Sequence, residues 1–181
     1  KGNHNLENAL FIIGTGKILN IPNELIAQFL KTTKALEHRL ENFFLKKNTL
    51  FVNDSKGTNV ESTVKAIEAF KNKVVLIAGG ENKKICNDEL IKKINERVGF
   101  VYLIGETGTI LAEEMDKVGY KKYKNLGTLE KVLLDIRENI DFEDGQTILF
   151  SPATASFDQF KNFEERGRIF KELTNKILGE K

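Results

Sequence analysis

Short apolar runs alternate with amphipathic stretches along most of this chain of 181 residues. The runs at 74–78, 100–104 and 147–150 are continuous and β-prone, as buried parallel strands are. Each is followed by a loop of small or polar residues and then by apolar residues at helical spacing. The runs at 43–45 and 50–52 flank a polar turn, which is typical of a hairpin. The pattern predicts an α/β fold, a Rossmann-like and mostly parallel sheet with helices on both faces.

A short helical segment is expected before the sheet. The apolar spacing over 6–19 and 24–31 predicts two helices with no strands of their own. The Gly-rich stretch 14–17 lacks the Gly-x-x-x-x-Gly-Lys-Ser/Thr pattern of a phosphate loop, and we expect it to end the first helix. Because these two helices have no sheet of their own and the chain starts without Met, we expect residues 1–36 to be the tail of a preceding domain and residues 37–181 to form a second domain.

Composition excludes several classes of function. A formal net charge of +2 is far from that of a strongly basic nucleic-acid binder. No apolar run approaches the ~20 residues of a membrane span, so no membrane partner is expected. A single cysteine, Cys86, cannot form an internal disulfide and fits a reducing cytoplasm, where we expect the protein to act. Two histidines and one cysteine are too few for a zinc cluster.

Three loops, 54–58, 79–83 and 151–156, directly follow predicted strands. Loops at the carboxyl ends of parallel strands emerge at one edge of a sheet, where ligands bind, so we expect the three to share a rim. The residues after 156 predict a helix with the apolar stripe Phe157, Phe160, Phe163, Phe170, Leu173 and Ile177. Two helix starts and a lysine on one rim suit a small dicarboxylic anion.

Each candidate residue on this rim has a functional and a structural interpretation. Asp54 could accept hydrogen bonds from a ribose, and Lys56 and Thr58 lie beside a positive helix end; the alternative is an ordinary polar turn. Lys83 could bind a carboxylate, although lysine is usually surface charge and the next residue is also lysine. Ser156 lies where a helix N-cap belongs, and capping alone would explain it.

Two of these loops also resemble a known family. The segment 151–167, Ser-Pro-Ala-Thr-Ala-Ser-Phe-Asp-Gln-Phe-Lys-Asn-Phe-Glu-Glu-Arg-Gly, resembles the C-terminal signature of the D-glutamate-adding branch of the Mur ligase family, which often has Cys at the position of Thr154. The segment 54–59, Asp-Ser-Lys-Gly-Thr-Asn, is similar to the same branch. Sister Mur ligases and folylpolyglutamate synthetases favour an Asp-x-Ala-His-type sequence there.

Weaker motifs follow in the family's order. His-Asn-x-x-Asn at 4–8 resembles the motif that closes the central ATPase domain. His38 and Arg39 resemble the pair at the crossing into the C-terminal domain. Gly-Gly-x-x-Lys at 79–83 is similar to the family's substrate-binding lysine motif.

The resemblance implies an ATP-dependent carboxylate–amine ligase of peptidoglycan synthesis. ATP phosphorylates the carboxylate of UDP-N-acetylmuramoyl-L-alanine, and the amine of D-glutamate attacks the acyl phosphate. By position, the nucleotide contacts would be Asn5, His38, Arg39 and Asp54, the catalytic residue near the phosphates would be Lys56, and the D-glutamate contacts would be Thr58, Lys83, Ser156 and Phe163. The phosphate loop, most Mg²⁺ ligands and the UDP-binding domain have no counterpart here, so we expect this chain to need those domains as partners and to be inactive alone.

Two alternatives stay open. One is another Mur-like amino-acid ligase of the folylpolyglutamate synthetase type. The other is a non-enzymatic α/β nucleotide-binding module, such as a receiver-like domain with Asp54 as phosphate acceptor, although such a domain needs an acidic cluster that the sequence lacks.

Overall fold

The computed structural model describes residues 3–32, 36–82 and 87–179, with the side chains of the first range described from residue 8 onward. The chain divides into two compact units, residues 1–36 and 37–181. Each unit is described by itself.

The first unit is a pair of helices, α1 (Asn3–Ile18) and α2 (Asn23–Thr32). The prediction that glycines end the first helix is wrong, since Gly14 and Gly16 lie inside α1. A Cβ on Gly16 would lie 2.6 Å from Cδ1 of Ile26, so this glycine lets α2 pack closely on α1. The turn falls instead at Asn20, which has a positive φ of 55°.

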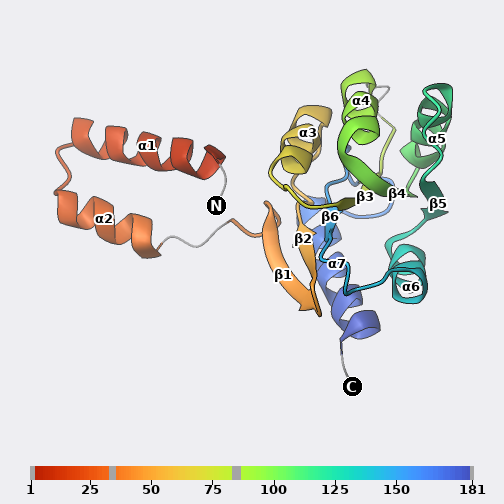
Figure 1. Cartoon of the computed structure of the whole chain (residues 1–181). Helices are drawn as coiled ribbons and strands as arrows, with labels where there is room; N and C mark the ends of the chain where they lie inside the picture. Colours follow the sequence, from red (N-terminus) through yellow and green to blue (C-terminus); the bar gives the residue numbers. More distant parts are fainter. Residues whose placement is uncertain (1–2, 33–35, 83–86, 180–181) are drawn as a thin grey trace. The chain divides into compact units, whose positions relative to one another are not determined.

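The second unit is a six-stranded sheet in the order β1-β2-β6-β3-β4-β5 (Figure 1). The strands are β1 (Glu41–Lys46), β2 (Thr49–Asn53), β3 (Val74–Gly79), β4 (Val98–Ile104), β5 (Tyr123–Gly127) and β6 (Thr147–Phe150). Strands β1 and β2 form the predicted antiparallel hairpin, and all other neighbours are parallel. The predicted α/β class and mostly parallel sheet are confirmed.

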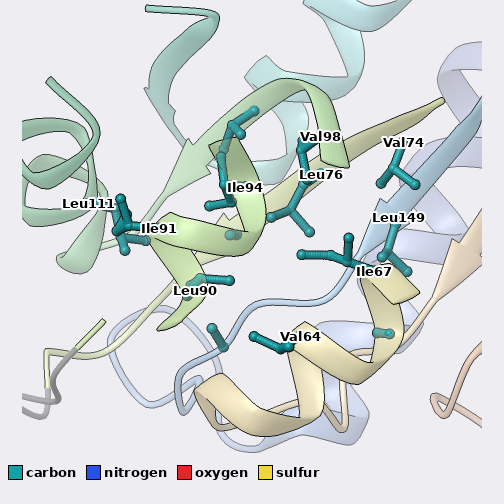
Figure 2. Close-up of a cluster of buried hydrophobic side chains, with 14 of the residues drawn as sticks. Val64, Ile67, Val74, Leu76, Leu90, Ile91, Ile94, Val98, Leu111 and Leu149 are labelled. Carbon is teal, nitrogen blue, oxygen red and sulfur yellow. The ribbon is translucent and has the colours of Figure 1, made fainter. Parts of the chain in front are cut away.

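Helices cover both faces of this sheet: α3 (Val60–Glu68), α4 (Asp88–Arg97), α5 (Thr107–Lys117), α6 (Leu129–Asn139) and α7 (Phe163–Leu178). Along β3, Leu76 and Ala78 join a buried cluster with α3, α4 and α5, which Figure 2 shows in part. Val75 and Ile77 join a second cluster with α6 and α7. Successive strand residues point to opposite faces, so one apolar run supplies two cores.

Two predicted boundaries are wrong. The edge strand expected at 119–123 begins only at Tyr123, because the chain before it is anchored by Tyr120, whose hydroxyl donates to the carbonyl of Val98 at 3.1 Å. The final helix begins at Phe163 rather than after residue 156. Asn162 caps it by accepting a hydrogen bond from the amide of Glu165 at 2.8 Å.

No helix among the described residues is both long enough and apolar enough to span a membrane.

Candidate functional site

The carboxyl ends of three neighbouring strands, β2, β6 and β3, carry the three loops singled out from the sequence. Backbone hydrogen bonds join these loops. The carbonyl of Gly57 accepts a hydrogen bond from the amide of Ala153 at 2.9 Å. The carbonyl of Pro152 accepts one from the amide of Gly79 at 2.8 Å, and the carbonyl of Ala155 accepts one from the amide of Glu81 at 3.0 Å. The predicted convergence is therefore confirmed for 54–58, 79–82 and 151–156, which we call the rim. Lys83 lies outside the described residues.

Asp54 is a buried part of the rim, with a relative exposure of 4%. Its Oδ2 accepts the hydroxyl of Ser151 at 2.6 Å, and its Oδ1 accepts the amide of Leu40 at 3.1 Å. Burial raises the pKa of Asp54 to about 6, although the hydrogen bonds from Ser151 and Leu40 and the charge of Arg39 act in the opposite direction. Gly57 leaves room for this network, because a Cβ there would lie 2.6 Å from Oδ2.

Lys56, on the loop after β2, and Phe163, the first residue of α7, meet beside the rim. Lys56 is exposed, and its ammonium lies 5.7 Å from the centroid of the Phe163 ring, a cation–π distance. The half-buried Thr58 immediately precedes Asn59, which caps α3 by accepting the amide of Ser62 at 2.8 Å. The positive end of α3 therefore lies beside Lys56 and Thr58, an arrangement that favours an anion.

Ser156 is buried at 2% exposure but does not cap a helix, so that part of the prediction is wrong. Its carbonyl instead accepts the amides of Gln159 and Phe160 at 3.2 and 2.8 Å, which closes an isolated turn. Phe157 is 63% exposed and does not belong to the apolar stripe. The stripe begins at Phe163 because only from there is the backbone helical.

The other predicted nucleotide contacts are divided between buried and exposed positions. His38 is 5% exposed, and its Nδ1 lies 2.9 Å from Nδ2 of the buried Asn53. A Cβ on Gly167 would lie 2.8 Å from Cγ of this imidazole, so the ring packs directly on that glycine. Arg39 is exposed. Asn5 belongs to the first unit, and its side chain lies outside the described set.

Arg166 is a buried residue of α7 that contacts the rim and that the sequence interpretation missed. It is fully buried, and Nε donates to the hydroxyl of Ser55 at 3.0 Å, Nη2 to the carbonyl of Ser55 at 2.8 Å and Nη1 to the carbonyl of Thr154 at 3.1 Å. Burial lowers its pKa to about 10, so the guanidinium stays charged at neutral pH. The signal was its position, three residues after Phe163 and four before Phe170, on the apolar stripe of α7.

Mg²⁺, which the resemblance implies, finds no suitable ligand set within the described ranges. One group there, Glu37, His38 and Glu41, brings its ligand atoms within 4.8 Å of one another. The ammonium of Lys171 already contacts Glu37 and Glu41 at 2.7 and 2.9 Å. Mg²⁺ prefers an open octahedral set of oxygens, so this group does not fit the ion.

Comparison with known proteins identifies the family of this chain. Residues 38–154 match the model described as "Mur ligase, glutamate ligase domain". The chain belongs to the Mur ligase family. The UDP-N-acetylmuramoylalanine–D-glutamate ligase of Fusobacterium nucleatum is 45% identical over 99% of this chain and 42% of its own length. The corresponding ligase of Caldicellulosiruptor bescii is 39% identical over 98% of this chain and 38% of its own length.

Solved Mur ligases share the fold of this chain. MurF from Acinetobacter baumannii aligns with a TM-score of 0.66 at 17% identity, over 95% of this chain and 38% of that protein. MurF from Thermotoga maritima in complex with ADP aligns with a TM-score of 0.56 at 17% identity, over 91% of this chain and 37% of that one. The chain thus spans about two fifths of the length of its Mur ligase relatives. Membership in the family favours a ligase over the signalling-module alternative.

Proposed function

We propose that this chain is the amino-acid-binding part of a UDP-N-acetylmuramoylalanine–D-glutamate ligase. One observation carries the proposal. The two segments that resemble the D-glutamate-adding branch, 54–59 and 151–167, interlock on a single rim through Gly57 and Ala153. The identity of 39 to 45% with ligases of that name supports D-glutamate over the amino acids of sister enzymes.

The proposed reaction forms one amide bond at the expense of ATP. The γ-phosphoryl group passes to the carboxylate of UDP-N-acetylmuramoyl-L-alanine, which yields ADP and an acyl phosphate. The amine of D-glutamate then attacks the acyl carbon; the C–N bond forms, the C–O bond to phosphate breaks, and the amine releases a proton. Nothing in this scheme needs a covalent nucleophile from the chain, whose contribution is positioning and charge stabilisation.

For D-glutamate, we propose contacts from Thr58, Ser156, Phe163 and Lys83. D-Glutamate carries two carboxylates, and the rim offers positive charge from the start of α3 and from the buried Arg166. Lys56 lies against Phe163 and is exposed, so it is free to approach a phosphate group while the aromatic ring borders the amino acid.

For the nucleotide, we propose Arg39 as the direct contact in this unit, because it is exposed. His38 and Asp54 are positioning residues in this scheme. The carbonyl of His38 accepts the amide of Lys56 at 3.0 Å, and Asp54 accepts the amide of Leu40. Together they fasten the segment 38–40 to the Lys56 loop. Asn5 would contact the nucleotide from the first unit.

The test is a phosphate-release assay on the full-length ligase that carries this chain. Release should require ATP, UDP-N-acetylmuramoyl-L-alanine and D-glutamate together, and the chain alone should form no product. Turnover with L-lysine or diaminopimelate in place of D-glutamate, or with a folate in place of UDP-N-acetylmuramoyl-L-alanine, would overturn the assignment.

A matched pair of lysines tests the site itself. Lys56→Met should lower kcat/KM, because the exposed ammonium at the rim is lost. Lys65→Met serves as the control, since Lys65 lies on α3 and pairs with Glu61 at 2.7 Å on the helix surface. Equal activity in the two variants would argue against a role for Lys56.

A further inference from the structure

The loop after β4 makes a dense set of contacts with the rim, although neither its sequence nor the family resemblance suggested a role for it. Thr107, the first residue of α5, is 6% exposed. Its Oγ1 accepts the amide of Gly80 at 2.9 Å and donates to the carbonyl of Gly80 at 3.1 Å. Its own amide donates to the same carbonyl at 2.9 Å. One threonine therefore engages both polar backbone groups of one glycine.

We call the bonds between Thr107 and Gly80 the clamp. A second contact extends the clamp along the segment 79–82. The Oε2 of Glu106 accepts the amide of Asn82 at 3.2 Å. The amide of Glu106 in turn donates to Oδ2 of Asp158 at 3.2 Å, which ties the clamp to the loop after β6. Gly105 makes the approach possible, because it has a φ of +67° and a Cβ there would lie 2.6 Å from Cα of Gly80.

The clamp acts where the backbone is least restricted. Gly79 has a φ of +113°, a conformation that other residues rarely adopt, and Gly80 follows it. A pair of glycines leaves the direction of the outgoing chain undetermined by sterics, so hydrogen bonds must define it. Thr107 and Glu106 supply such bonds, and the carbonyl of Ala155 supplies another by accepting the amide of Glu81 at 3.0 Å.

We infer that Thr107 is a positioning residue for the amino-acid substrate. By holding Gly80 it sets the path of 79–82, whose Glu81 amide bonds to the carbonyl of Ala155, the residue before the proposed D-glutamate contact Ser156. The inference rests on the proposed function. Its consequence is selective: loss of the Thr107 hydroxyl should weaken the use of D-glutamate and leave the use of ATP unchanged, because the direct nucleotide contact proposed in this unit is Arg39, with His38 and Asp54 as its positioning residues.

Kinetics of the full-length ligase test this. Thr107→Val removes both hydrogen bonds of the hydroxyl and should raise the KM for D-glutamate by about tenfold, with the KM for ATP unchanged. Thr107→Ser keeps the hydroxyl and should restore the wild-type KM. Thr107→Ala provides a second hydroxyl-free variant should the valine not fold.

Thr147→Val is the matched control. Thr147 is 1% exposed and exchanges two hydrogen bonds with the side chain of Asn72, at 3.0 and 3.2 Å. It begins β6, at the sheet edge opposite the rim, so its loss should lower stability without changing either KM.

Amide hydrogen exchange on the chain itself tests whether Thr107 holds Gly80, independently of the proposed function. The amide of Gly80 should exchange faster in Thr107→Val but not in Thr107→Ser or Thr147→Val. An enzyme that does not use D-glutamate would overturn the proposed function, whatever the exchange result. A D-glutamate-dependent enzyme whose KM is unmoved by Thr107→Val, or moved equally for ATP, would overturn the positioning role alone.

Discussion

Replacing Asp54 by asparagine should change how the stability of the second unit depends on pH. The carboxyl group is 4% exposed, and burial raises its pKa from 3.8 to about 6. Between these values the folded state binds more protons than the unfolded chain, so the free energy of unfolding falls as pH rises. Each pKa unit corresponds to about 1.36 kcal/mol, so this one group should cost about 3 kcal/mol by pH 7. Below pH 3.8 the cost is absent.

The measurement is urea denaturation of wild type and Asp54→Asn from pH 3.5 to 7.5. All three tyrosines, Tyr102, Tyr120 and Tyr123, lie in the second unit, so tyrosine fluorescence reports on that unit. The wild-type free energy, taken relative to the variant, should fall by about 3 kcal/mol across this range, while contributions from other carboxylates cancel in the difference. Asparagine can keep the bond from Leu40 and donate to Ser151.

Parallel curves for the two proteins would refute the reasoning, since they would mean that the Asp54 carboxyl titrates in the folded state as it does in the unfolded chain. Asp116→Asn is the control of opposite sign. Asp116 is an exposed carboxylate whose pKa is lowered by hydrogen bonds from Lys121 and Tyr123. It contributes stability that is present at neutral pH and lost on acidification, so its replacement should not produce the fall expected for Asp54.

Three further substitutions test the packing. Gly57→Ala places a Cβ 2.6 and 2.7 Å from two buried side-chain oxygens and should cost about 1–3 kcal/mol in urea denaturation; an unchanged midpoint would contradict this. In Gly14→Ala the new Cβ meets open space within α1. Alanine favours the helix over glycine by about 1 kcal/mol, so helix content measured by circular dichroism should rise. Arg166→Met leaves two buried carbonyl oxygens without this donor and should lower the free energy of unfolding by about 2 kcal/mol or more, and wild-type stability would refute the role assigned to the guanidinium.

The sheet and the meeting of the loops were predictable because both follow from local pattern. A continuous apolar run such as 74–78 determines a buried strand, and the polar residues after it must then leave at the carboxyl end. The cap of α3 at Asn59 and that of α6 at Thr128 follow from the same kind of local signal.

The start of α7 was mispredicted because spacing alone does not say where a periodic pattern becomes helical. Phe157, Phe160 and Phe163 continue the period of the helix into an irregular segment. The decisive signal was Asn162 followed three residues later by Glu165, whose carboxylate accepts the amide of Lys161 at 2.7 Å while Asn162 caps Glu165. That reciprocal pattern is close to a capping box.

Other features depend on contacts between distant residues and have no local signal. Gly16 lies in a helix rather than a turn because Ile26 of the next helix packs against it. The left-handed φ of 65° at Ala153, a non-glycine residue, is imposed where its amide bonds to Gly57. Neither contact can be read from the residues around it, since each partner lies at least ten residues away.

The buried acidic and basic side chains in and beside the rim are best explained by function. Among the described residues, His38, Asp54 and Arg166 are the buried side chains of this type, whereas the buried ionisable side chains of Tyr102 and Tyr120 belong to the two hydrophobic clusters. All three bear on 53–58: His38 contacts Asn53, Asp54 belongs to the loop, and Arg166 binds Ser55 at two atoms. Burying a charge lowers stability, and for the same reason burial raises the pKa of Asp54 and lowers the pKa of Arg166. A fold selected only for stability would place apolar groups there. The charged groups of Asp54 and Arg166 hold one loop in one conformation, which the reaction proposed above would require of a site that positions its substrates.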